Sequence, residues 1–227
     1  MKTIGLIGGM SYESTIEYYR IINELVNERL GGLKSAKMLI ESYDFSIIEN
    51  LQTKNDWDNL GLILADSAKK LETLGADFIA IATNTMHYVA PFVKKNIKIP
   101  LIHIVQATLN QIKRKNHDCV CLLGTKYTMS LPFYKEILED NNIKVIIPKD
   151  EDKEVINDII YNELCVGIIN KESKDKLLSI IETCSKLGAS AAVLGCTELP
   201  NIIKKAPIDL IDTTKAHCIE IVDRILA

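Results

Sequence analysis

The stretch LGADFIAIATNT at residues 74–85 recurs in altered form as LGASAAVLGCTE at residues 187–198. In both copies Leu-Gly-Ala follows an amphipathic stretch, a mostly apolar run comes next, and small polar residues end the run. The offset is constant, because 196 − 83 = 113 for Cys196 and Thr83 and 188 − 75 = 113 for the two glycines. A repeat of this length predicts two half-molecules of similar build, each with one polar loop. If the halves face each other, Thr83 and Cys196 meet across a shared cleft, which suits chemistry on two opposite faces of one carbon atom.

Short runs of aliphatic or β-branched residues recur along the chain and, together with the repeat, indicate the fold class. They lie at residues 3–7, 37–43, 77–82, 100–104, 119–123, 143–147, 190–195 and 208–211. Stretches of helical periodicity separate most of them, and such alternation is typical of βαβ units with a mostly parallel sheet. We therefore predict an α/β fold with two pseudo-symmetric lobes, each a mostly parallel sheet flanked by helices, and an active site in the inter-lobe cleft.

The boundary between the lobes is predicted at Lys98-Ile99, just before Pro100, where the first repeat is complete. The first lobe then comprises residues 1–98 plus 210–227, and the second comprises residues 99–209. The last helix, from about Asp212, is expected to pack on the first lobe.

Three helices are the clearest in the pattern. The first follows the first strand and ends at Gly31-Gly32, and the others span residues 57–74 and 154–166. The apolar stripes predicted to be buried are Ile16, Tyr19, Ile22 or Asn23, Val26 and Leu30 in the first, Leu60, Leu64, Ala68, Leu71 and Leu74 in the second, and Val155, Ile159, Ile160 and Leu164 in the third.

The bulk composition excludes several classes of partner. With 227 residues, 47% hydrophobic and 25% charged, the chain can bury a sizeable core. A formal charge of −3 gives no electrostatic reason to expect nucleic acid or an anionic membrane. No apolar run approaches the roughly 20 residues that cross a bilayer. Met1-Lys2 and the following apolar run indicate a first strand and turn, not a secretory signal, so we expect a cytoplasmic protein.

Loops at the carboxyl ends of the strands are the places where ligands bind in doubly wound sheets. Gly8-Gly9-Met10-Ser11 opens the first half, and Gly124-Thr125-Lys126-Tyr127-Thr128 opens the second. Gly5-x-x-Gly8-Gly9 differs from the dinucleotide-binding fingerprint G-x-G-x-x-G, so a nucleotide site is disfavoured. A tight turn that needs glycine and a backbone cradle for a carboxylate both remain open for this loop.

Cys196 differs from the other five cysteines, which we interpret as reduced and structural. The sequence has no C-x-x-C pair or histidine cluster, and we expect no metal site. Cys196 ends a predicted strand after Gly195 and precedes Thr197 and Glu198. Backbone N–H groups and a helix start at such a position favour a reactive thiolate, so we predict a catalytic role.

Thr83 is a candidate because the repeat pairs it with Cys196, since a lone threonine at a strand end is usually a cap. His87 follows four residues later, and both a surface position and a role near the site remain open. His103, His117 and His217 lack partners at a recognisable spacing and are interpreted as structural.

Four motifs together resemble the aspartate/glutamate racemases that work without pyridoxal phosphate. They are KTIGLIGGM at residues 2–10, TNTMH at 83–87, LGTKYTM at 123–129 and LGCTE at 194–198. The resemblance covers essentially the whole chain. It is strongest to the bacterial subgroup acting on L-aspartate and L-glutamate, in which a threonine replaces one of the two usual cysteines.

The resemblance implies a substrate held between two α/β lobes and proton transfer at its α-carbon without a cofactor. Carried over, Cys196 and Thr83 are the catalytic pair, and the thiol–hydroxyl difference implies a preference for the L enantiomer. The residues that would line the substrate are Met10, Gln52, Asn84, Thr85, Thr125, Thr197 and Glu198. The resemblance also implies that the protein is a homodimer and that it binds a small amino-acid substrate.

This sequence departs from the family pattern at the distal end of the substrate. Gln52 lies in the region where many members have an arginine, and Cys165 lies near the position of a lysine. The reaction type is unaffected, but selection for an acidic side chain is weakened. Two alternatives therefore stay open: a single-cysteine decarboxylase or isomerase of a small diacid, and a non-catalytic module that binds a small ligand.

Overall fold

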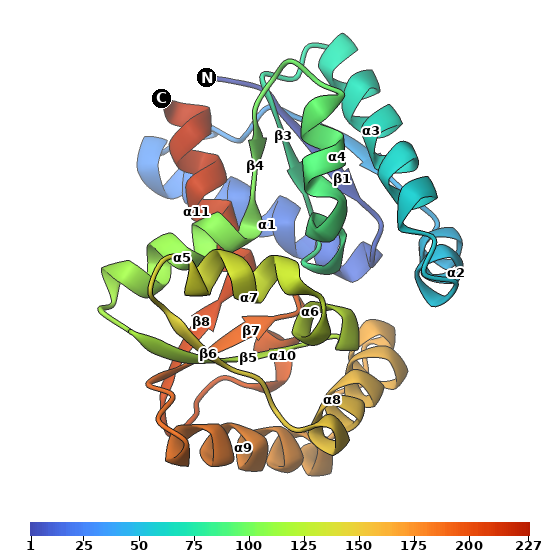
Figure 1. Cartoon of the computed structure of the whole chain (residues 1–227). Coiled ribbons are helices and arrows are strands. Elements are labelled where there is room, and N and C mark those ends of the chain that lie inside the picture. Colours follow the sequence, from blue (N-terminus) through green and yellow to red (C-terminus); the bar gives the residue numbers. More distant parts are fainter. The chain divides into compact units, whose positions relative to one another are not determined.

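Two four-stranded sheets form in succession along the chain (Figure 1). The computed structural model describes residues 1–227 and divides into two compact parts. Unit 1 comprises residues 1–104 and 217–227, and unit 2 comprises residues 105–216. The chain passes from one unit to the other within α5 (Ile104–Arg114) and within α11 (Thr213–Leu226).

The sheet of unit 1 is entirely parallel, with the strand order β2-β1-β3-β4. Its strands are β1 (Ile4–Gly8), β2 (Met38–Ser42), β3 (Phe78–Ile81) and β4 (Leu101–Ile102). Its helices are α1 (Tyr12–Leu30), α2 (Phe45–Thr53), α3 (Trp57–Thr73), the 3₁₀ helix η1 (Thr85–Val89) and α4 (Ala90–Lys95).

Alternate residues of β1 and β3 supply two separate cores, because successive side chains of a strand point to opposite faces. Leu6 and Ala80 pack in one core with residues of α1 and α11. Ile7 and Ile79 pack in the other with residues of α2, α3 and α4. Both faces of the sheet are thus covered, as expected for parallel strands that are apolar throughout.

Unit 2 repeats this strand order as β6-β5-β7-β8, again with every pair parallel. Its strands are β5 (Cys119–Gly124), β6 (Lys144–Ile146), β7 (Ala191–Gly195) and β8 (Asp209–Asp212). Besides α5, its helices are α6 (Lys126–Ser130), α7 (Pro132–Glu139), α8 (Asp150–Asn162), η2 (Leu164–Val166), α9 (Lys171–Lys186) and α10 (Leu199–Ile202). Cys121 and Leu123 of β5 pack in a core with residues of α8 and α9. The shared order confirms the predicted α/β fold with two similar halves.

The eight strands expected from the sequence are all present, each within two residues of its predicted ends. The last helix packs where predicted, because Cys218, Ile221 and Val222 join the core of unit 1. The third helix begins earlier than expected, at Asp150, because three acidic residues in its first turn favour a helix N-terminus. Leu74 was predicted to be buried on α3, but it caps the helix end and is 70% exposed.

The buried face of α1 differs from the prediction. Ile16 and Tyr19 are 53% and 55% exposed, whereas Tyr18, Ile22 and Val26 are fully buried. The prediction is thus confirmed at Ile22 and Val26 and wrong at Ile16, Tyr19 and Leu30. The buried face includes Tyr18 instead, and the Tyr18 hydroxyl has a buried partner on α11.

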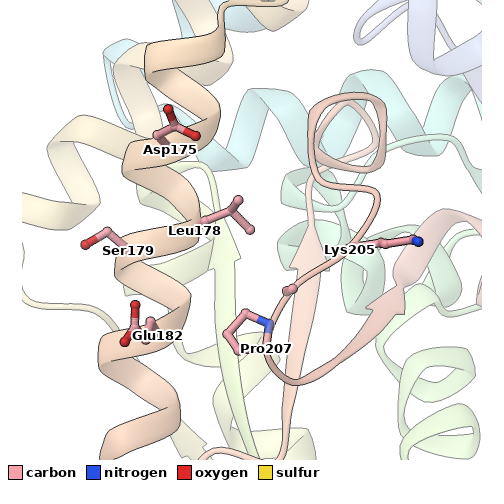
Figure 2. A pocket seen from close by; sticks show the side chains of 7 residues that line it. Asp175, Leu178, Ser179, Glu182, Lys205 and Pro207 are labelled. Atoms are coloured by element: carbon pink, nitrogen blue, oxygen red, sulfur yellow. The ribbon is translucent and has the colours of Figure 1, made fainter.

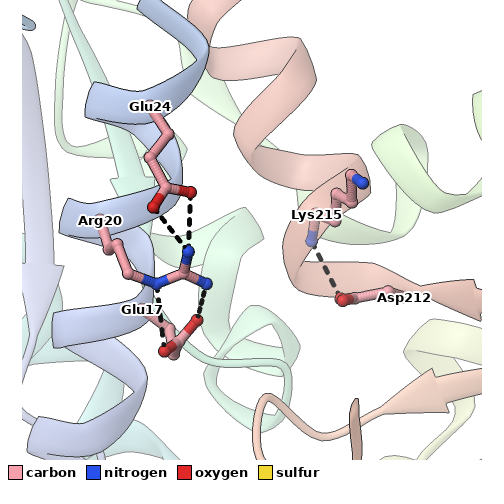
Figure 3. A network of polar contacts seen from close by, with 5 residues as sticks. All are labelled: Glu17, Arg20, Glu24, Asp212 and Lys215. Carbon is pink, nitrogen blue, oxygen red and sulfur yellow. Dashed lines mark hydrogen bonds and ion pairs between the residues drawn. The ribbon is translucent and has the colours of Figure 1, made fainter. Parts of the chain in front are cut away.

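Charged residues form polar contacts in both units (Figure 3). On α1, Arg20 forms ion pairs with Glu17 at 2.6 Å and Glu24 at 2.7 Å. Exposed pairs of this kind stabilise a protein by less than about 1 kcal/mol. In unit 2, the backbone N–H of Lys215 donates to Asp212 Oδ1 at 3.0 Å as α11 begins.

Of the helices described, none is both long and apolar enough to cross a membrane.

His217 is the buried partner of Tyr18, and it holds three elements of unit 1 together. Its Nε2 lies 3.0 Å from the carbonyl oxygen of Ile102, and its Nδ1 lies 2.8 Å from the Tyr18 hydroxyl. Because a carbonyl only accepts, Nε2 carries the hydrogen and Nδ1 accepts from Tyr18. Burial lowers the pKa of His217 to about 3, so the ring is neutral near pH 7.

Acid is therefore expected to destabilise unit 1 well above pH 4. Below about pH 6.5 the unfolded chain binds a proton at this histidine and the folded chain does not, so folding stability falls as pH falls. For His217 alone the loss reaches about 2 kcal/mol at pH 5. The check is the free energy of unfolding of wild type and His217→Gln between pH 7.5 and 5. The variant should show a shallower acid dependence.

Glutamine is chosen because its amide can donate to Ile102 and accept from Tyr18. Gln111→Asn, at a partly exposed position on α5 in unit 2, removes no titratable group and is the control, which should keep the wild-type slope. Parallel curves for wild type and His217→Gln would show that His217 is not the group involved.

Candidate active site

The loop after β1 requires glycine for steric reasons. Gly9 has a φ of +82°, and a Cβ atom there would lie 2.3 Å from the backbone N and O of Tyr43. Its N–H donates to Thr15 Oγ1 at 2.8 Å. The structure thus supports the tight-turn interpretation, and the Gly9 N–H is already bonded within the protein. Met10 follows and is 4% exposed, packed in the core of α2, α3 and α4.

The loop after β3 presents Thr83 at the end of a buried strand. Ser14 Oγ donates to the carbonyl oxygen of Ala82 at 2.6 Å and so fixes the strand end to α1. Thr83 itself is partly exposed, while Asn84 and Thr85 are only 3% and 5% exposed. Thr83 is therefore the residue of this cluster with the most access to solvent.

His87 fixes the backbone of Thr83. Its Nδ1 lies 2.8 Å from the Thr83 carbonyl oxygen, so Nδ1 carries the hydrogen and donates. Burial, and then the nearby rings of His103 and His217, lower the pKa of His87, which keeps it neutral. The side chain is fully buried, so the surface interpretation of His87 was wrong. The bond instead supports a role near Thr83.

Gln52 joins α2 to the segment that follows Thr83. The side chain is 2% exposed, and its Nε2 donates to Met86 Sδ at 3.2 Å. Its Oε1 is buried without a hydrogen-bond partner. Position 52 thus carries a neutral amide and no positive charge. The sulfur atom of Met86 is the weak acceptor that holds this amide.

In unit 2, two facing glycines bring the site loops together. Gly124 of β5 and Gly195 of β7 are register partners, and a Cβ at Gly195 would lie 2.8 Å from the carbonyl oxygen of Leu123. A side chain at either glycine would crowd the backbone of the neighbouring strand at this end of the sheet. Thr125 therefore lies at the strand end next to that of Cys196, where it caps α6 by accepting from the Thr128 N–H at 3.2 Å.

Cys196 donates its thiol hydrogen to a buried carboxylate. Its Sγ lies 3.0 Å from Glu198 Oε2, and Thr197 Oγ1 donates to the same oxygen at 2.5 Å. Cys165 of η2 lies 4.0 Å from the other oxygen, Oε1. Cys196 and Glu198 are 8% and 4% exposed, so this cluster is almost closed to water within unit 2.

The environment of Cys196 favours the thiol. Burial is the largest influence, and with the charge of Glu198 and the nearby Cys165 it raises the pKa of Cys196 well above its usual range. The backbone N–H of Glu198 lowers this pKa, but more weakly. The backbone therefore favours a thiolate, as expected, but burial and the carboxylate outweigh it, so the prediction of a thiolate was wrong overall. Burial, and then Glu198, likewise raise the pKa of Cys165 to about 12.

Comparison with protein-family models gives one match that spans most of the chain. The model described as Asp/Glu/Hydantoin racemase matches residues 7–221. The chain belongs to this racemase family. It is accordingly an enzyme of the isomerase class.

Individual racemases agree with the family match. A candidate Asp/Glu racemase from Yersinia pestis has 44% identity, full coverage of both chains and a TM-score of 0.93. An aspartate racemase homologue from Pyrococcus horikoshii OT3 has 34% identity, again with full coverage of both chains, and a TM-score of 0.87. The broad specificity amino-acid racemase RacX of Bacillus subtilis (strain 168) is 28% identical over 160 residues, which is 69% of each chain.

The predicted site residues of this racemase-family chain are divided between the units. Unit 1 carries Met10, Gln52, Thr83, Asn84 and Thr85, and unit 2 carries Thr125, Cys196, Thr197 and Glu198. Cys196, Thr197 and Glu198 are joined by hydrogen bonds.

Cys165 contacts the same carboxylate, although no spacing in the sequence links residue 165 to residue 198. His87 could have been found from its spacing, because a residue four positions after Thr83 can return to its carbonyl. No group of three or more His, Cys, Asp or Glu is arranged to hold a metal ion.

A surface pocket of about 510 Å³ in unit 2 is built by other residues (Figure 2). Side chains of α9 form one wall, and the segment before β8 forms the other. The lining residues are Asp175, Leu178, Ser179, Glu182, Lys205, Ala206 and Pro207. None of the predicted site residues lines this pocket.

Proposed function

We propose that the protein racemises an acidic amino acid, aspartate or glutamate, and prefers the L enantiomer. Cys196 and Thr83 transfer protons at opposite faces of the α-carbon. The reaction uses no pyridoxal phosphate or other cofactor. We further propose that the protein is a cytoplasmic homodimer, as its resemblance to racemases of this type implies.

The equivalent placement of Thr83 and Cys196 carries this proposal. Each residue follows the third strand of its sheet, β3 or β7, in two sheets of identical order. Membership of the Asp/Glu/hydantoin racemase family supports amino-acid racemisation as the reaction of such a pair. A two-face transfer needs one proton-carrying group from each side, and in this proposal Thr83 and Cys196 are those two groups.

The chemical difficulty is the weak acidity of the α-hydrogen. The electron pair left on the α-carbon must be stabilised through the substrate carboxylate, and convergent N–H and O–H donors do this best in a site without water. We propose that Asn84, Thr85, Thr125 and Thr197 contribute such donors. Met10, Gln52 and Glu198 complete the lining in this proposal. Positioned acid and base groups can add about 10²–10⁴-fold to the rate.

The exchange of threonine for cysteine makes the two directions unequal. A thiol can ionise and take a proton, whereas a hydroxyl is far too weakly acidic to wait as a permanent base. Thr83 can deliver a proton to the α-carbon and regain one from solvent when the product leaves. Catalysis that starts from the Cys196 side should therefore be faster, and resemblance assigns that side to the L enantiomer.

The side chain of the substrate is held by neutral groups in this proposal. Gln52 can hydrogen-bond a carboxylate or an amide, but it supplies no positive charge. Charged pairs give stronger and more selective recognition than neutral ones. Discrimination between acidic and other polar side chains should therefore be modest, in keeping with the broad specificity in the name of RacX.

Proton NMR of the purified protein with L- and D-amino acids in deuterium oxide tests this function directly. The α-hydrogen signals of L-aspartate and L-glutamate should disappear fastest, and those of the D enantiomers should disappear more slowly. Asparagine and glutamine should react more slowly than the acids, by about tenfold or less.

The same experiment has outcomes that contradict the proposal. Equal exchange of both enantiomers would remove the argument from asymmetry. Absence of exchange, together with carbon dioxide release from a malonate-type diacid, would favour a decarboxylase. Thermal stabilisation by an amino acid without any turnover would favour a binding module.

A further inference from the structure

The carbonyl group of Thr83 is held by a side chain, whereas its counterpart in unit 2 is held by the backbone. The Cys196 carbonyl oxygen accepts from the N–H of Leu199 at 3.3 Å. In unit 1, η1 is a 3₁₀ helix, and the N–H of His87 bonds to the Asn84 carbonyl at 3.0 Å. The Thr83 carbonyl oxygen accepts instead from Nδ1 of the His87 ring at 2.8 Å.

The second half of the repeat has no histidine of this kind. The position equivalent to His87 is Pro200, because 87 + 113 = 200, and proline offers no N–H. Only the loop that carries the threonine therefore has a ring tied to the carbonyl of its candidate catalytic residue. A feature confined to one half bears on what distinguishes the halves, which is the hydroxyl of Thr83 against the thiol of Cys196.

The ring of His87 is a rigid support. It is fully buried, and the ring centroids of His103 and His217 lie 4.7 Å and 5.5 Å from its own, both in edge-on contact. His217 is itself fixed by hydrogen bonds at both ring nitrogens. Because burial lowers the pKa of His87, the ring is neutral and carries its one hydrogen on Nδ1, which faces the Thr83 carbonyl.

The second ring nitrogen of His87 adds nothing to stability. Its Nε2 is buried without a hydrogen-bond partner. A buried polar atom without a partner lowers stability, and most buried side-chain atoms avoid this state. A leucine would fill much of the same space without that cost. The bond from Nδ1 to Thr83, and not packing, therefore explains the histidine.

The position of the Thr83 hydroxyl depends directly on the backbone. A single torsion separates Oγ1 from the Cα atom of threonine, and the branched Cβ makes that torsion stiff. The peptide group before Thr83 is held because Ser14 Oγ donates to the Ala82 carbonyl at 2.6 Å. The peptide group after it is held by His87. These two bonds together restrain the hydroxyl.

We propose that His87 is a positioning residue that holds the Thr83 hydroxyl in place for delivery of a proton to the α-carbon. This inference rests on the proposed racemase function and deepens it, because it assigns one step to a residue outside the substrate lining. His87 acts through the Thr83 carbonyl and, being buried, does not touch the substrate. Removal of the α-hydrogen at the Cys196 face does not use this support. Loss of the bond should therefore impair inversion and spare exchange.

The test compares His87→Leu with His87→Asn in the full-length protein. Leucine and asparagine have nearly the same shape, but the amide nitrogen of asparagine takes the place of Nδ1. With L-aspartate and L-glutamate, His87→Leu should lose about 10²-fold in kcat for formation of the D enantiomer, as expected when a reacting group is misplaced. Its KM and its α-hydrogen exchange in deuterium oxide should stay within about threefold of wild type. His87→Asn should recover most of the inversion.

A double variant shows whether His87 acts through Thr83. If it does, addition of His87→Leu to Thr83→Ala should lower inversion no further, because residues that act as a unit are not additive. His217→Gln is the matched control, because it changes another buried ring of the same cluster that has no bond to Thr83. It should exchange and invert L-aspartate as wild type does.

Other results would overturn the inference. Equal loss of exchange and inversion in His87→Leu would mean that the histidine only supports the loop. Inversion as poor in His87→Asn as in His87→Leu would mean that the bond to Thr83 is not the cause. A further loss in the double variant would mean that His87 acts independently of Thr83.

The wild-type protein separates failure of this inference from failure of the function. If wild type exchanges no α-hydrogen, the proposed function fails and the inference fails with it. If wild type is active and His87→Leu inverts the substrate equally well, only the inference about His87 fails.

Discussion

Replacement of Cys196 by alanine is expected to abolish α-hydrogen exchange, with a loss of at least about 10³-fold in kcat/KM. The alanine variant retains the fold, because the side chain lost is small, but it has no group that can take the α-hydrogen. Thr83→Ala should lose about 10²-fold in formation of the D enantiomer, because the proton-accepting side remains and only delivery to the other face is lost. The measurements are proton NMR in deuterium oxide with L-aspartate and L-glutamate, for exchange, and separation of the enantiomers, for inversion.

Two control variants separate chemistry from packing. Cys119→Ala removes a partly exposed thiol from β5 and should leave the exchange rate unchanged. Thr83→Ser keeps the hydroxyl and should keep most of the activity. Substantial exchange by Cys196→Ala would show that another residue is the base, and the proposed pair would have to be abandoned.

Substitution of Gly9 by alanine is expected to cause the largest loss of stability among single changes at the site loops. The new Cβ would lie 2.3 Å from backbone atoms of Tyr43, and Gly9 also has a positive φ. A backbone contact of this kind cannot be relieved by turning a side chain, so the connection between β1 and β2 must move. The expected cost is about 3 kcal/mol or more in the free energy of unfolding. Denaturant titration of wild type and variant measures it.

Gly75→Ala is the matched control for this loss. Gly75 lies in the same unit with a φ of +93°, but a Cβ there would have no atom within 4 Å. Its cost should be only that of the backbone conformation, about 1 kcal/mol. Equal destabilisation by the two substitutions would show that the close approach to Tyr43 contributes nothing.

The sequence pattern was sufficient for the fold because each strand is a short apolar run bounded by polar residues. Repetition of LGADFIAIATNT as LGASAAVLGCTE predicted two halves of similar build, each with a mostly parallel sheet, and the structure adds that the two sheets share one strand order. The pattern failed in part on α1, where Ile16 and Tyr19 were predicted to be buried and Tyr18 is buried instead, hydrogen-bonded to His217. Periodicity along a helix carries no information about a partner almost 200 residues away.

The placement of the candidate site residues after strands was predictable for a similar reason. Position after a strand singled out Thr83 and Cys196, because such loops follow directly from the strand pattern. The protonation of Cys196 was mispredicted, because it depends on burial and on the direction of the Glu198 side chain. The contact of Cys165 with Glu198 was also missed, because it depends on how η2 folds back toward β7.

Identical strand order in the two units has an evolutionary consequence. It is the arrangement expected when the gene for one ancestral unit is duplicated and the copies are fused. A symmetric pair of separate, identical units must carry the same residue at both equivalent positions. Once the copies are joined in one chain, each can mutate on its own. The difference between Thr83 and Cys196 is one that a single continuous chain permits, and in the mechanism proposed above it allows the two faces of the substrate to be treated unequally.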